Sequence, residues 1–397
     1  MERHGAIMLL ALWLGCVARD STDWGDAEGI CWEEPDLEET LLSEVLMGYE
    51  IRLTFFGDLF WGRGVDIYAQ KQQEGYAYPF EKLSSFRKHK HEVWIGNLEC
   101  PVTKEQESYA LMRSLLKFSC KPEYLEHARR YFDIFSLANN HTNNMEEVDG
   151  FAQTKAYLTG HGFQFFGSFD NARLLDICEV VSVPAVPINA LGKQHPKQDP
   201  ILFPIALCGF HNVIKLPLEE ELDVISEYAE HFFTIVMPHQ GEEYQPVQNR
   251  WQEKFYRKMI DRGADIIVGG HTHSIQGVEW YQEKPIIYSL GNFVFDQNFG
   301  TTMYGLVYRL EMFVSQEEEI FSPDIYWDVR DCRGFQDTCL HTAEHHGFAK
   351  PILSFSQDVD IAHNKSMQPQ KAEKSIQEQK KKEIGWNAFI EDISSPK

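Results

Sequence analysis

Polar side chains follow five apolar, strand-length runs of this chain, each within a few residues of the end of the run. In an open α/β sheet, ligand sites collect at the carboxyl ends of the strands, so residues in these positions are expected to meet at one edge. The side chains are carboxylates, amides and imidazoles. In chain order they are Asp58, Asn97, Glu99, Asn139, Asn140, His141, His239, His271 and His273.

These residue types are the ones that bind divalent metal ions. Neutral imidazole suits Zn, Mn or Fe, whereas carboxylates and amide carbonyls suit Mn, Fe or Mg. No cysteine belongs to the set, which argues against a structural zinc site. Taken alone, an aspartate such as Asp58 is more often a turn or capping residue, and an isolated His-x-His such as His271 and His273 is a weak signal for a metal. The ordered combination of all nine predicts a metal centre.

Strands and helices alternate in the part of the chain that carries these residues. Strands are expected at 51–56, 92–96, 132–138, 163–167, 202–210, 232–237 and 264–270. Helical patterns lie between them at 122–131, 147–158, 218–231 and 247–262. This alternation predicts an α/β fold with a buried sheet. After Gly270 the pattern becomes β-rich, with apolar runs at 277–282, 285–293 and 301–313.

Composition bounds the class of protein. The 397 residues are 43% hydrophobic, which excludes a wholly disordered chain. The 60 acidic residues outnumber the 37 lysines and arginines, giving a net charge of −23. A general nucleic-acid binder needs clustered cations, so no nucleic-acid partner is expected. An anionic substrate would need local compensation, for which a bound metal is the obvious device.

The ends of the chain differ from its middle. An apolar run at 6–18 is too short to span a bilayer and resembles the core of a secretory signal. Residues 1–20 are therefore expected to be a signal peptide or lipoprotein anchor, with Cys16 as the candidate lipid anchor, which places the protein at the cell envelope. Cleavage near Ala18, an uncleaved anchor and a short buried helix stay open.

We expect an acidic linker over 21–50, one folded domain over 51–350 and a polar, charged tail over 351–397. The lysine-rich stretch at 368–383 suits a charged helix or a loose tail. The eight cysteines contain no C-x-x-C pair, which excludes a zinc ribbon. Cys332 and Cys339 are close enough in sequence to bridge in an oxidising compartment, or they remain two thiols.

Six motifs in chain order carry a resemblance: GDLFWGR, GNLECP, LANNH, PHQGEEY, GGHTH and YSLGNFVFD. Over residues 51–297 they resemble the CapA/PgsA family of capsule and poly-γ-glutamate synthesis proteins, which have a calcineurin-like metallophosphoesterase fold. The resemblance implies an α/β sandwich of two mixed β-sheets flanked by helices. It also implies two divalent metal ions at the edge of the sheets, with Mn, Fe or Zn expected.

The same resemblance assigns roles residue by residue. Asp58 and His273 would hold the first metal, Glu99 would bridge, and the second metal would be held by Asn140, His239 and His271. His141 would act beside the metals as acid or electrophile, and Arg63 would meet an anionic group. Residues expected to orient these groups are Asn97, Asn139, Glu242 and Asn292, the last as part of a supporting turn rather than in direct contact. Glu243 and Tyr244 stand next to Glu242 and share its expected role, or this stretch is simply a polar loop.

Three positions depart from the family pattern. Phe60 stands where the wider superfamily has the histidine of Asp-x-His, so the first metal is expected to bind more weakly. Gln240 follows His239 in place of a tryptophan, and Asn144 replaces an aspartate three residues after His141. These changes bear on metal identity and substrate rather than on the fold.

The implied function is a metal-dependent hydrolase or transferase of capsule or poly-γ-glutamate biosynthesis, acting on an anionic polymer or a phosphoester. Ester, phosphoester and γ-amide chemistry all stay open, and membrane proteins of capsule synthesis are candidate partners. The alternative is a non-catalytic component that binds or exports the polymer. A nucleotidase-like phosphatase is a third reading, but little chain after about residue 330 remains for a nucleoside-binding domain.

Overall fold

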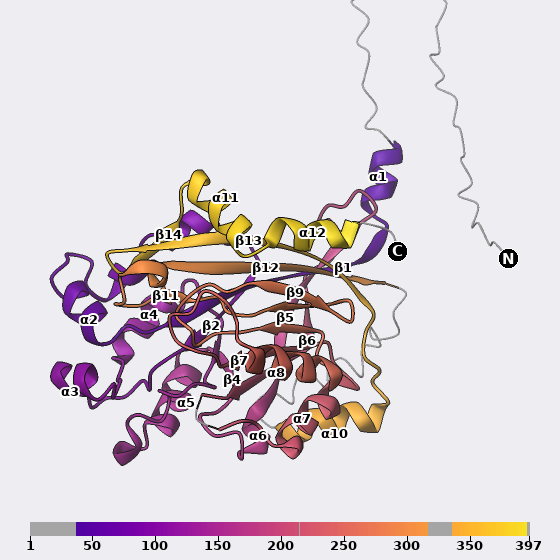
Figure 1. Cartoon of the computed structure of the whole chain (residues 1–397). Coiled ribbons are helices and arrows are strands. Elements are labelled where there is room, and N and C mark those ends of the chain that lie inside the picture. The colour runs from indigo at the N-terminus through magenta and orange to yellow at the C-terminus, as the bar shows by residue number, and fades with distance from the viewer. Residues whose placement is uncertain (1–36, 214, 317–335, 395–397) are drawn as a thin grey trace, which may run out of the picture.

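The computed structural model describes residues 37–213, 215–316 and 336–394 (Figure 1). The strands are β1 (Leu46–Leu59), β2 (Val93–Leu98), β3 (Ile134–Ser136), β4 (Gln164–Phe166), β5 (Cys178–Asn189), β6 (Ile201–His211), β7 (Thr234–His239), β8 (Ile266–Val268), β9 (Val278–Tyr281), β10 (Lys284–Ile287), β11 (Asn292–Val294), β12 (Tyr304–Ser315), β13 (Leu353–Lys365) and β14 (Gln368–Lys371).

The α-helices are α1 (Leu37–Ser43), α2 (Arg63–Ala69), α3 (Tyr109–Ser114), α4 (Leu125–Ala128), α5 (Gly150–Gly160), α6 (Leu174–Ile177), α7 (Glu219–Ala229), α8 (Arg250–Asp261), α10 (Gln336–His346), α11 (Lys374–Glu383) and α12 (Trp386–Ser394). Short 3-10 helices are η1 (Gly75–Phe80), η2 (Leu83–Phe86), η3 (Pro122–Tyr124), η4 (Glu146–Val148) and η5 (Gly300–Met303).

Strand β1 organises the sheet because its two halves have different partners. Its first half pairs antiparallel with β5, and its second half pairs parallel with β2 and β11. One branch then continues through β6, β7, β8, β10 and β9, and the other through β3 and β4. The expected mixed α/β fold is confirmed. The two sheets expected from the sequence are joined at β1 into one mixed, 14-stranded network.

The two faces of β1 contact different hydrophobic cores. Successive strand residues point to opposite faces, so Phe55 and Phe56 enter separate clusters. Phe55 joins the aliphatic core of β5 to β8, whereas Phe56 packs in an aromatic core against Trp94, Phe132 and Phe293. Because both faces are covered, the last seven residues of β1 are all buried. Asp58 lies among them.

Helix α8 shows how the covering helices are specified. Its N-cap, Asn249, accepts hydrogen bonds from the backbone of Trp251 and Gln252. The residues at helical spacing that follow, including Phe255, Tyr256 and Met259, are buried against the sheet. In Figure 1, α7 and α8 lie in the lower part of the molecule, and α11 and α12 lie at the top, along β13.

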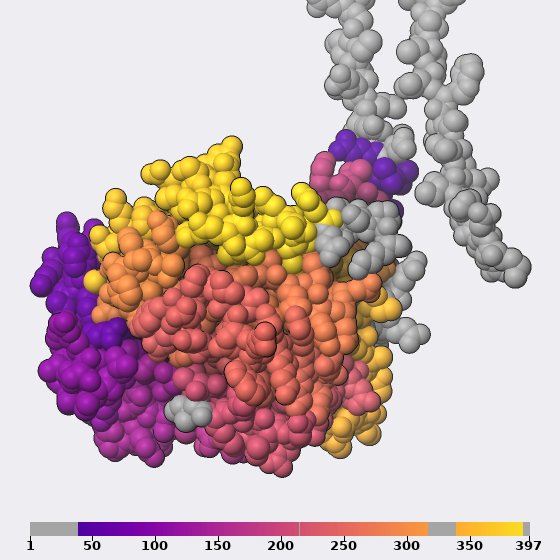
Figure 2. Space-filling model, viewed as in Figure 1, coloured from indigo at the N-terminus to yellow at the C-terminus, as the bar shows by residue number. Residues whose placement is uncertain are grey.

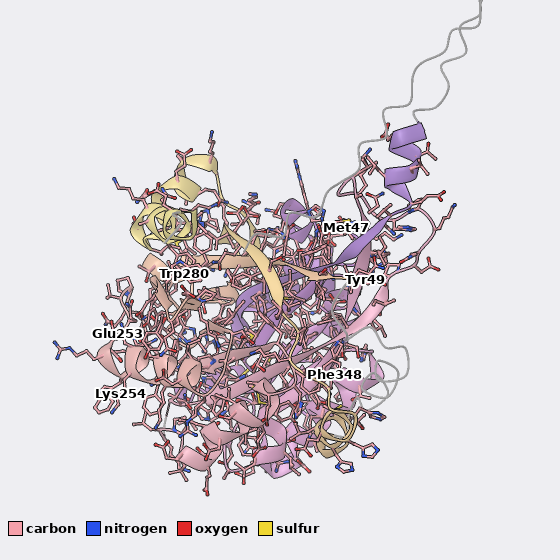
Figure 3. The ribbon with its side chains drawn as sticks, turned by 90° about the vertical axis from the view of Figure 1, so that its right-hand side faces the viewer. Met47, Tyr49, Glu253, Lys254, Trp280 and Phe348 are labelled. Carbon is pink, nitrogen blue, oxygen red and sulfur yellow. A yellow bond between two sulfur atoms is a disulfide. The ribbon has the colours of Figure 1, made fainter. Side chains whose placement is uncertain are left out.

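The C-terminal segment differs from the expected polar tail. Strand β13 pairs antiparallel with β12 from Leu353 to His363, and β14 pairs with β13. The last helix also packs, since Trp280 of β9, which is labelled in Figure 3, stacks on Phe389 of α12 with ring centroids 4.7 Å apart. In the space-filling view this yellow segment lies against the rest of the molecule (Figure 2). Alternating exposed and half-buried residues in β13 explain its polar sequence.

Disulfides join Cys100 to Cys120 and Cys178 to Cys208. Cys339 is also disulfide-bonded, but Cys332 lies outside the described residues, so the expected pair is not described. The signal or anchor segment, Cys16 and most of the acidic linker lie outside the described residues too. No helix in the described ranges is long and apolar enough to cross a membrane.

Candidate metal centre

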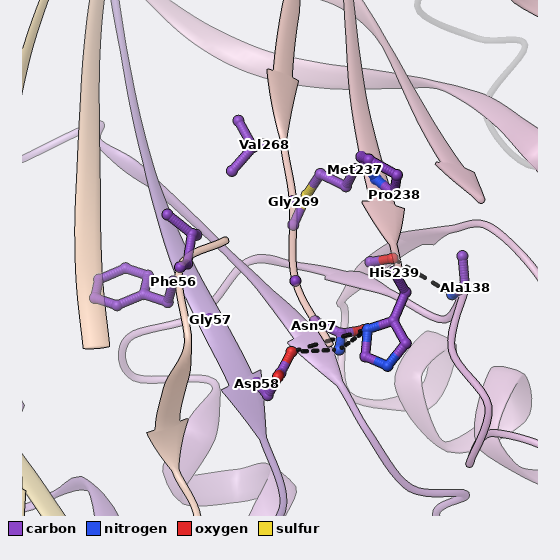
Figure 4. A pocket seen from close by; sticks show the side chains of 13 residues that line it. Phe56, Gly57, Asp58, Asn97, Ala138, Met237, Pro238, His239, Val268 and Gly269 are labelled. Carbon is purple, nitrogen blue, oxygen red and sulfur yellow. Dashed lines mark hydrogen bonds and ion pairs between the residues drawn. The ribbon is translucent and has the colours of Figure 1, made fainter. Parts of the chain in front are cut away.

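Three neighbouring strands place the first polar side chains side by side. Asp58 of β1 is in register with Asn97 of β2 on one side and with Asn292 of β11 on the other. The register of β1 shifts between Phe56 and Asp58 in the pairing with β2. Such a bulge re-aims the side chain that follows it. Asp58, Asn97 and His239 then line one pocket at the strand ends (Figure 4).

Glu99 lies in the middle of the cluster. Its Oε1 is 3.8 Å from His141 Nε2, 3.9 Å from His239 Nε2 and 3.9 Å from His273 Nε2. His273 Nδ1 is in turn 3.4 Å from Asp58 Oδ2. Glu99, which the family resemblance assigns as the ligand that bridges two metals, is thus surrounded by three imidazoles.

The second group of expected ligands lies next to the first. His239 Nε2 is 2.9 Å from Asn140 Oδ1, and the rings of His239 and His271 have centroids 4.8 Å apart. The loop after β8 holds His271 and His273 in left-handed backbone conformations, with φ of 86° and 55°. Such strain in residues with a Cβ is typical of functional sites. Gly270 lets this loop lie close to Asp58, since a Cβ at position 270 would lie 3.1 Å from Asp58 Oδ1.

Several buried polar atoms of this cluster lack a hydrogen-bond partner among the described residues. They are Asp58 Oδ2, both carboxylate oxygens of Glu99 and His271 Nδ1. Buried polar atoms are normally paired, and an unpaired one calls for an explanation such as an ion. Ligand atoms of Asp58, Glu99 and His273 all lie within 4.8 Å of one another, so these three buried residues could hold a metal ion. The donor set therefore fits a divalent cation.

The pKa values of Glu99 and His273 are shifted because their side chains are buried close together. Burial, and after it the charge of Asp58, raises the pKa of Glu99 well above its ordinary value. Burial lowers the pKa of His273, but the charges of Glu99 and Asp58 outweigh burial and raise it to about 9. In the metal-free protein, His273 is therefore an imidazolium at neutral pH.

The other imidazoles are neutral. Burial lowers the pKa of His271 to about 3 and that of His141 to about 4, and it lowers the pKa of His239 well below the ordinary value. Neutral imidazole is the form that binds metal. His239 and His271 are thus already in the ligating form at neutral pH, whereas His273 must first lose a proton.

The expected orienting amides contact the expected ligands. Asn97 Nδ2 donates to Asp58 Oδ1 at 2.9 Å and lies 3.2 Å from His239 Nδ1. Asn139 Nδ2 donates to Asn97 Oδ1 at 3.1 Å, and its own Oδ1 accepts from the backbone of His141. Asn292 Oδ1 is 2.8 Å from His273 Nδ1, so Asn292 contacts an expected ligand. Such contacts fix the orientation of metal ligands.

His141 is held between Asn144 and Phe118. Its Nδ1 is 2.8 Å from Asn144 Oδ1, which can only accept, so Nδ1 carries the hydrogen of the neutral ring. Nε2 is then a free lone pair that faces Glu99 at 3.8 Å. Phe118 stacks on the imidazole with centroids 3.9 Å apart, a contact that no sequence motif indicated.

Arg63 is not free. Its guanidinium pairs with both carboxylate oxygens of Asp296, at 2.7 and 2.5 Å, and lies 4.8 Å from the centroid of Phe118. Arg63 therefore packs against Phe118, the ring that stacks on His141, and Asp296 compensates the charge of Arg63. Among the acidic residues of the 240–244 loop, Glu242 is exposed, and it is its neighbour Glu243 whose charge acts on Glu99 and His273.

Sequence reasoning missed His211, although this residue follows the apolar run at 202–210 as the other site residues follow theirs. His211 is the register partner of His239 on the neighbouring strand. With Phe169, Asp170, Asn171 and Lys215 it lines a cavity of about 280 Å³. The same rule of strand ends would have found it.

Comparisons with known proteins identify the family of this chain. The family described as "Bacterial capsule synthesis protein PGA_cap" matches residues 52–297, a range that includes every site residue above. The chain is 28% identical to the capsule biosynthesis protein CapA of Bacillus anthracis over 64% of this chain and 62% of that protein. It is also 28% identical to the PGA biosynthesis protein CapA of Bacillus subtilis over 63% of this chain and 64% of that protein.

Both matches thus span less than two thirds of each relative's length. Among solved structures, a phosphatase from Mycoplasma pneumoniae aligns over 79% of this chain and 95% of its own, with 12% identity and a TM-score of 0.38. A TM-score this low carries no weight for fold or function. The family match covers most of β1, all of β2 to β11 and the cluster at the strand ends, and by that match this chain belongs to the PGA_cap family of bacterial capsule synthesis proteins.

Proposed function

We propose that this protein is a metal-dependent hydrolase that acts on an anionic polymer such as poly-γ-glutamate at the cell envelope. One observation carries the proposal: five strand ends bring Asp58, Glu99 and three imidazoles together, with carboxylate oxygens that have no hydrogen-bond partner among the described residues. A purely structural site would have paired these oxygens. Membership of the family supports the substrate class.

Two divalent ions are proposed, of which Mn, Fe or Zn fits the donors. Asp58, Glu99 and His273 would hold one, and Glu99, Asn140, His239 and His271 the other. When bound, such ions neutralise an anionic group and polarise the bond that reacts. They would also supply positive charge locally, in a chain whose net charge of −23 otherwise repels an acidic polymer.

His141 is proposed as the proton acceptor. Its Nδ1 is occupied by Asn144, and burial lowers its pKa to about 4, so at neutral pH its Nε2 is a lone pair. The acid role implied by the family resemblance fits less well than this one, because the ring holds no spare proton. Arg63, tied to Asp296, is proposed to keep Phe118 and hence His141 in place.

Export to the cell envelope is proposed together with this activity. The two described disulfides suit an oxidising compartment, as does the apolar segment at the start of the chain. The cavity lined by His211, the register partner of His239, also contains Lys215, whose ammonium group pairs with Glu221 at 3.2 Å.

The competing proposal is a protein that binds or exports the polymer without cutting it. Phe60 favours this reading, because it stands where the wider superfamily has a histidine, and its ring is buried against Phe118 with centroids 4.3 Å apart. One metal would then be weakly held, which is enough for binding.

Variants of His141 and His271 separate the two proposals. His141→Ala should keep the metal and the polymer affinity but lose about 10²–10⁴-fold in turnover of a γ-glutamyl polymer or a generic phosphodiester. His271→Ala should lose metal, affinity and turnover together. If metal-loaded wild type binds polyglutamate yet cleaves no ester or γ-amide, the binding protein is the correct reading.

A further inference from the structure

Two exposed aromatic side chains stand at the rim of the metal centre. Tyr244 is 41% exposed and Phe299 is 56% exposed, and their rings have centroids 5.7 Å apart. Tyr244 also lies against the expected ligand His273, with centroids 5.8 Å apart and planes at 30°. Single exposed aromatics are common on protein surfaces, but adjoining rings that reach a buried site are not.

The position of Tyr244 is enforced by its backbone. Its φ is 64°, a left-handed conformation that is unfavourable for a bulky residue. The conformation is held because the Tyr244 amide donates to the carbonyl of Thr272 at 2.7 Å, inside the His271–His273 loop. Folding thus stores strain to bring this ring to the site, which is typical of residues with a function.

Hydrogen bonding also fixes the position of the Tyr244 hydroxyl group. Gln297 Nε2 donates to the Tyr244 hydroxyl at 3.1 Å, and Gln297 Oε1 accepts from Asn292 Nδ2 at 3.0 Å. Asn292 in turn contacts His273 Nδ1 at 2.8 Å. A continuous chain of hydrogen bonds therefore ties the aromatic rim to the metal centre and keeps the ring in one orientation.

We propose that Tyr244 and Phe299 form a stacking wall that selects substrates whose links next to the reacting bond are flat amides. The inference rests on the proposed function, since it concerns the polymer bound at the metal centre. A ring face attracts a flat, polarisable group and gains nothing from a tetrahedral phosphate. A polymer of amide planes with pendant carboxylates offers both groups: carboxylates for the metal centre and planes for the wall.

The test compares two polyanions on metal-loaded protein: poly-γ-glutamate, which has amide planes, and polyphosphate, which has none. Tyr244→Leu should weaken binding of poly-γ-glutamate about three- to tenfold and leave polyphosphate binding and metal content unchanged. Tyr244→Phe keeps the ring but loses the hydrogen bond from Gln297, so it should retain most of the affinity that Tyr244→Leu loses. Tyr109→Leu is the matched control, because Tyr109 is 44% exposed on α3.

Phe299→Leu provides a second variant whose backbone is extended rather than left-handed, so it tests the wall even where Tyr244→Leu fails to fold. Equal weakening of both polymers, or of neither, would overturn the stacking wall while leaving the proposed function in place. If wild type binds neither polymer, the proposed function fails, and the inference fails with it.

Discussion

Glu99 and His273 are buried next to each other, so the protonation state of one affects the pKa of the other. Each perturbs the other: the Glu99 carboxylate raises the pKa of His273, and the His273 charge opposes the rise that burial causes in the pKa of Glu99. Sequence reasoning could name both residues, because each follows a strand end. It could not find that Glu99 is surrounded by three imidazoles or that Arg63 is occupied by Asp296, because both facts depend on tertiary distances.

The raised pKa of His273 predicts how the stability of the metal-free protein depends on pH. Its folded pKa of about 9 lies above the ordinary 6.5, so the stability it contributes is fully present below pH 6.5 and is lost as the pH rises through 9. The free energy of unfolding in urea with EDTA should therefore fall over this window, by up to about 1.4 kcal/mol per pH unit.

Two variants show whether His273 causes that fall. His273→Asn should flatten it, whereas His161→Asn, at an exposed helix end, should keep it. An unchanged slope in His273→Asn would contradict the buried pair. Because a metal needs the neutral imidazole, binding at pH 7 should also release a proton from His273.

At the scale of elements, the site depends on how closely two segments approach. Gly57 precedes Asp58 in the bulge of β1, and a Cβ there would lie 1.8 Å from the carbonyl oxygen of Gly291. Gly57→Ala should thus push β1 from β11, destabilise the fold by about 1–3 kcal/mol and lower metal affinity by moving Asp58.

Gly160→Ala is the matched control for this substitution. Gly160 ends α5, and a Cβ there meets nothing within 4 Å. It should gain about 0.5–1 kcal/mol through its helix propensity. The measurements are thermal unfolding and metal titration, and a Gly57→Ala protein with native metal affinity would show that the close approach does not position Asp58.

Strand β13 is joined to the sheet by a buried ion network. Arg309 of β12 is 2.9 Å from Glu92 and 3.3 Å from Asp360 of β13, and both acids are buried. Arg309→Met would leave two buried carboxylates without this partner and should cost about 3–5 kcal/mol in urea unfolding. Lys374→Met, at a 91% exposed side chain, should cost nothing measurable. Equal stabilities would mean that β13 is only loosely attached.

The elements also show where the sequence misleads. The long apolar runs at 51–56, 202–210 and 232–237 do form β1, β6 and β7, since buried strands need continuous hydrophobic sequence. Strand β5 was missed because Pro184 and Pro187 interrupt it, and its alternating half-buried pattern is weak. Strand β13 was missed because a strand with one solvated face resembles a polar tail.

At the scale of the whole molecule, the net charge of the protein and its proposed metal centre have opposite effects on the binding of a polyanion. A net charge of −23 repels a polyanion, whereas the proposed metal centre attracts it locally. Added salt screens long-range repulsion between exposed charges more than contacts at a buried site. Affinity for poly-γ-glutamate in saturating Mn²⁺ should therefore rise between low and physiological ionic strength.

This salt dependence has the opposite sign to that of a basic polyanion binder, whose affinity falls with salt. Binding isotherms at several NaCl concentrations measure it, with EDTA-treated protein as the control that should not bind at all. A steady fall in affinity from the lowest salt upward would indicate a cationic surface rather than the metal centre as the docking point.

The central claim is that the strand-end cluster is a metal centre, and elemental analysis tests it most directly. Wild-type protein loaded with Mn, Fe or Zn and then dialysed should retain one or two divalent ions per chain. The Asp58→Asn, Glu99→Gln double variant keeps the size of both side chains and removes the two buried charges, so it should fold but retain none. Wild type that holds no divalent ion after loading, or a double variant that holds as much as wild type, would contradict the claim.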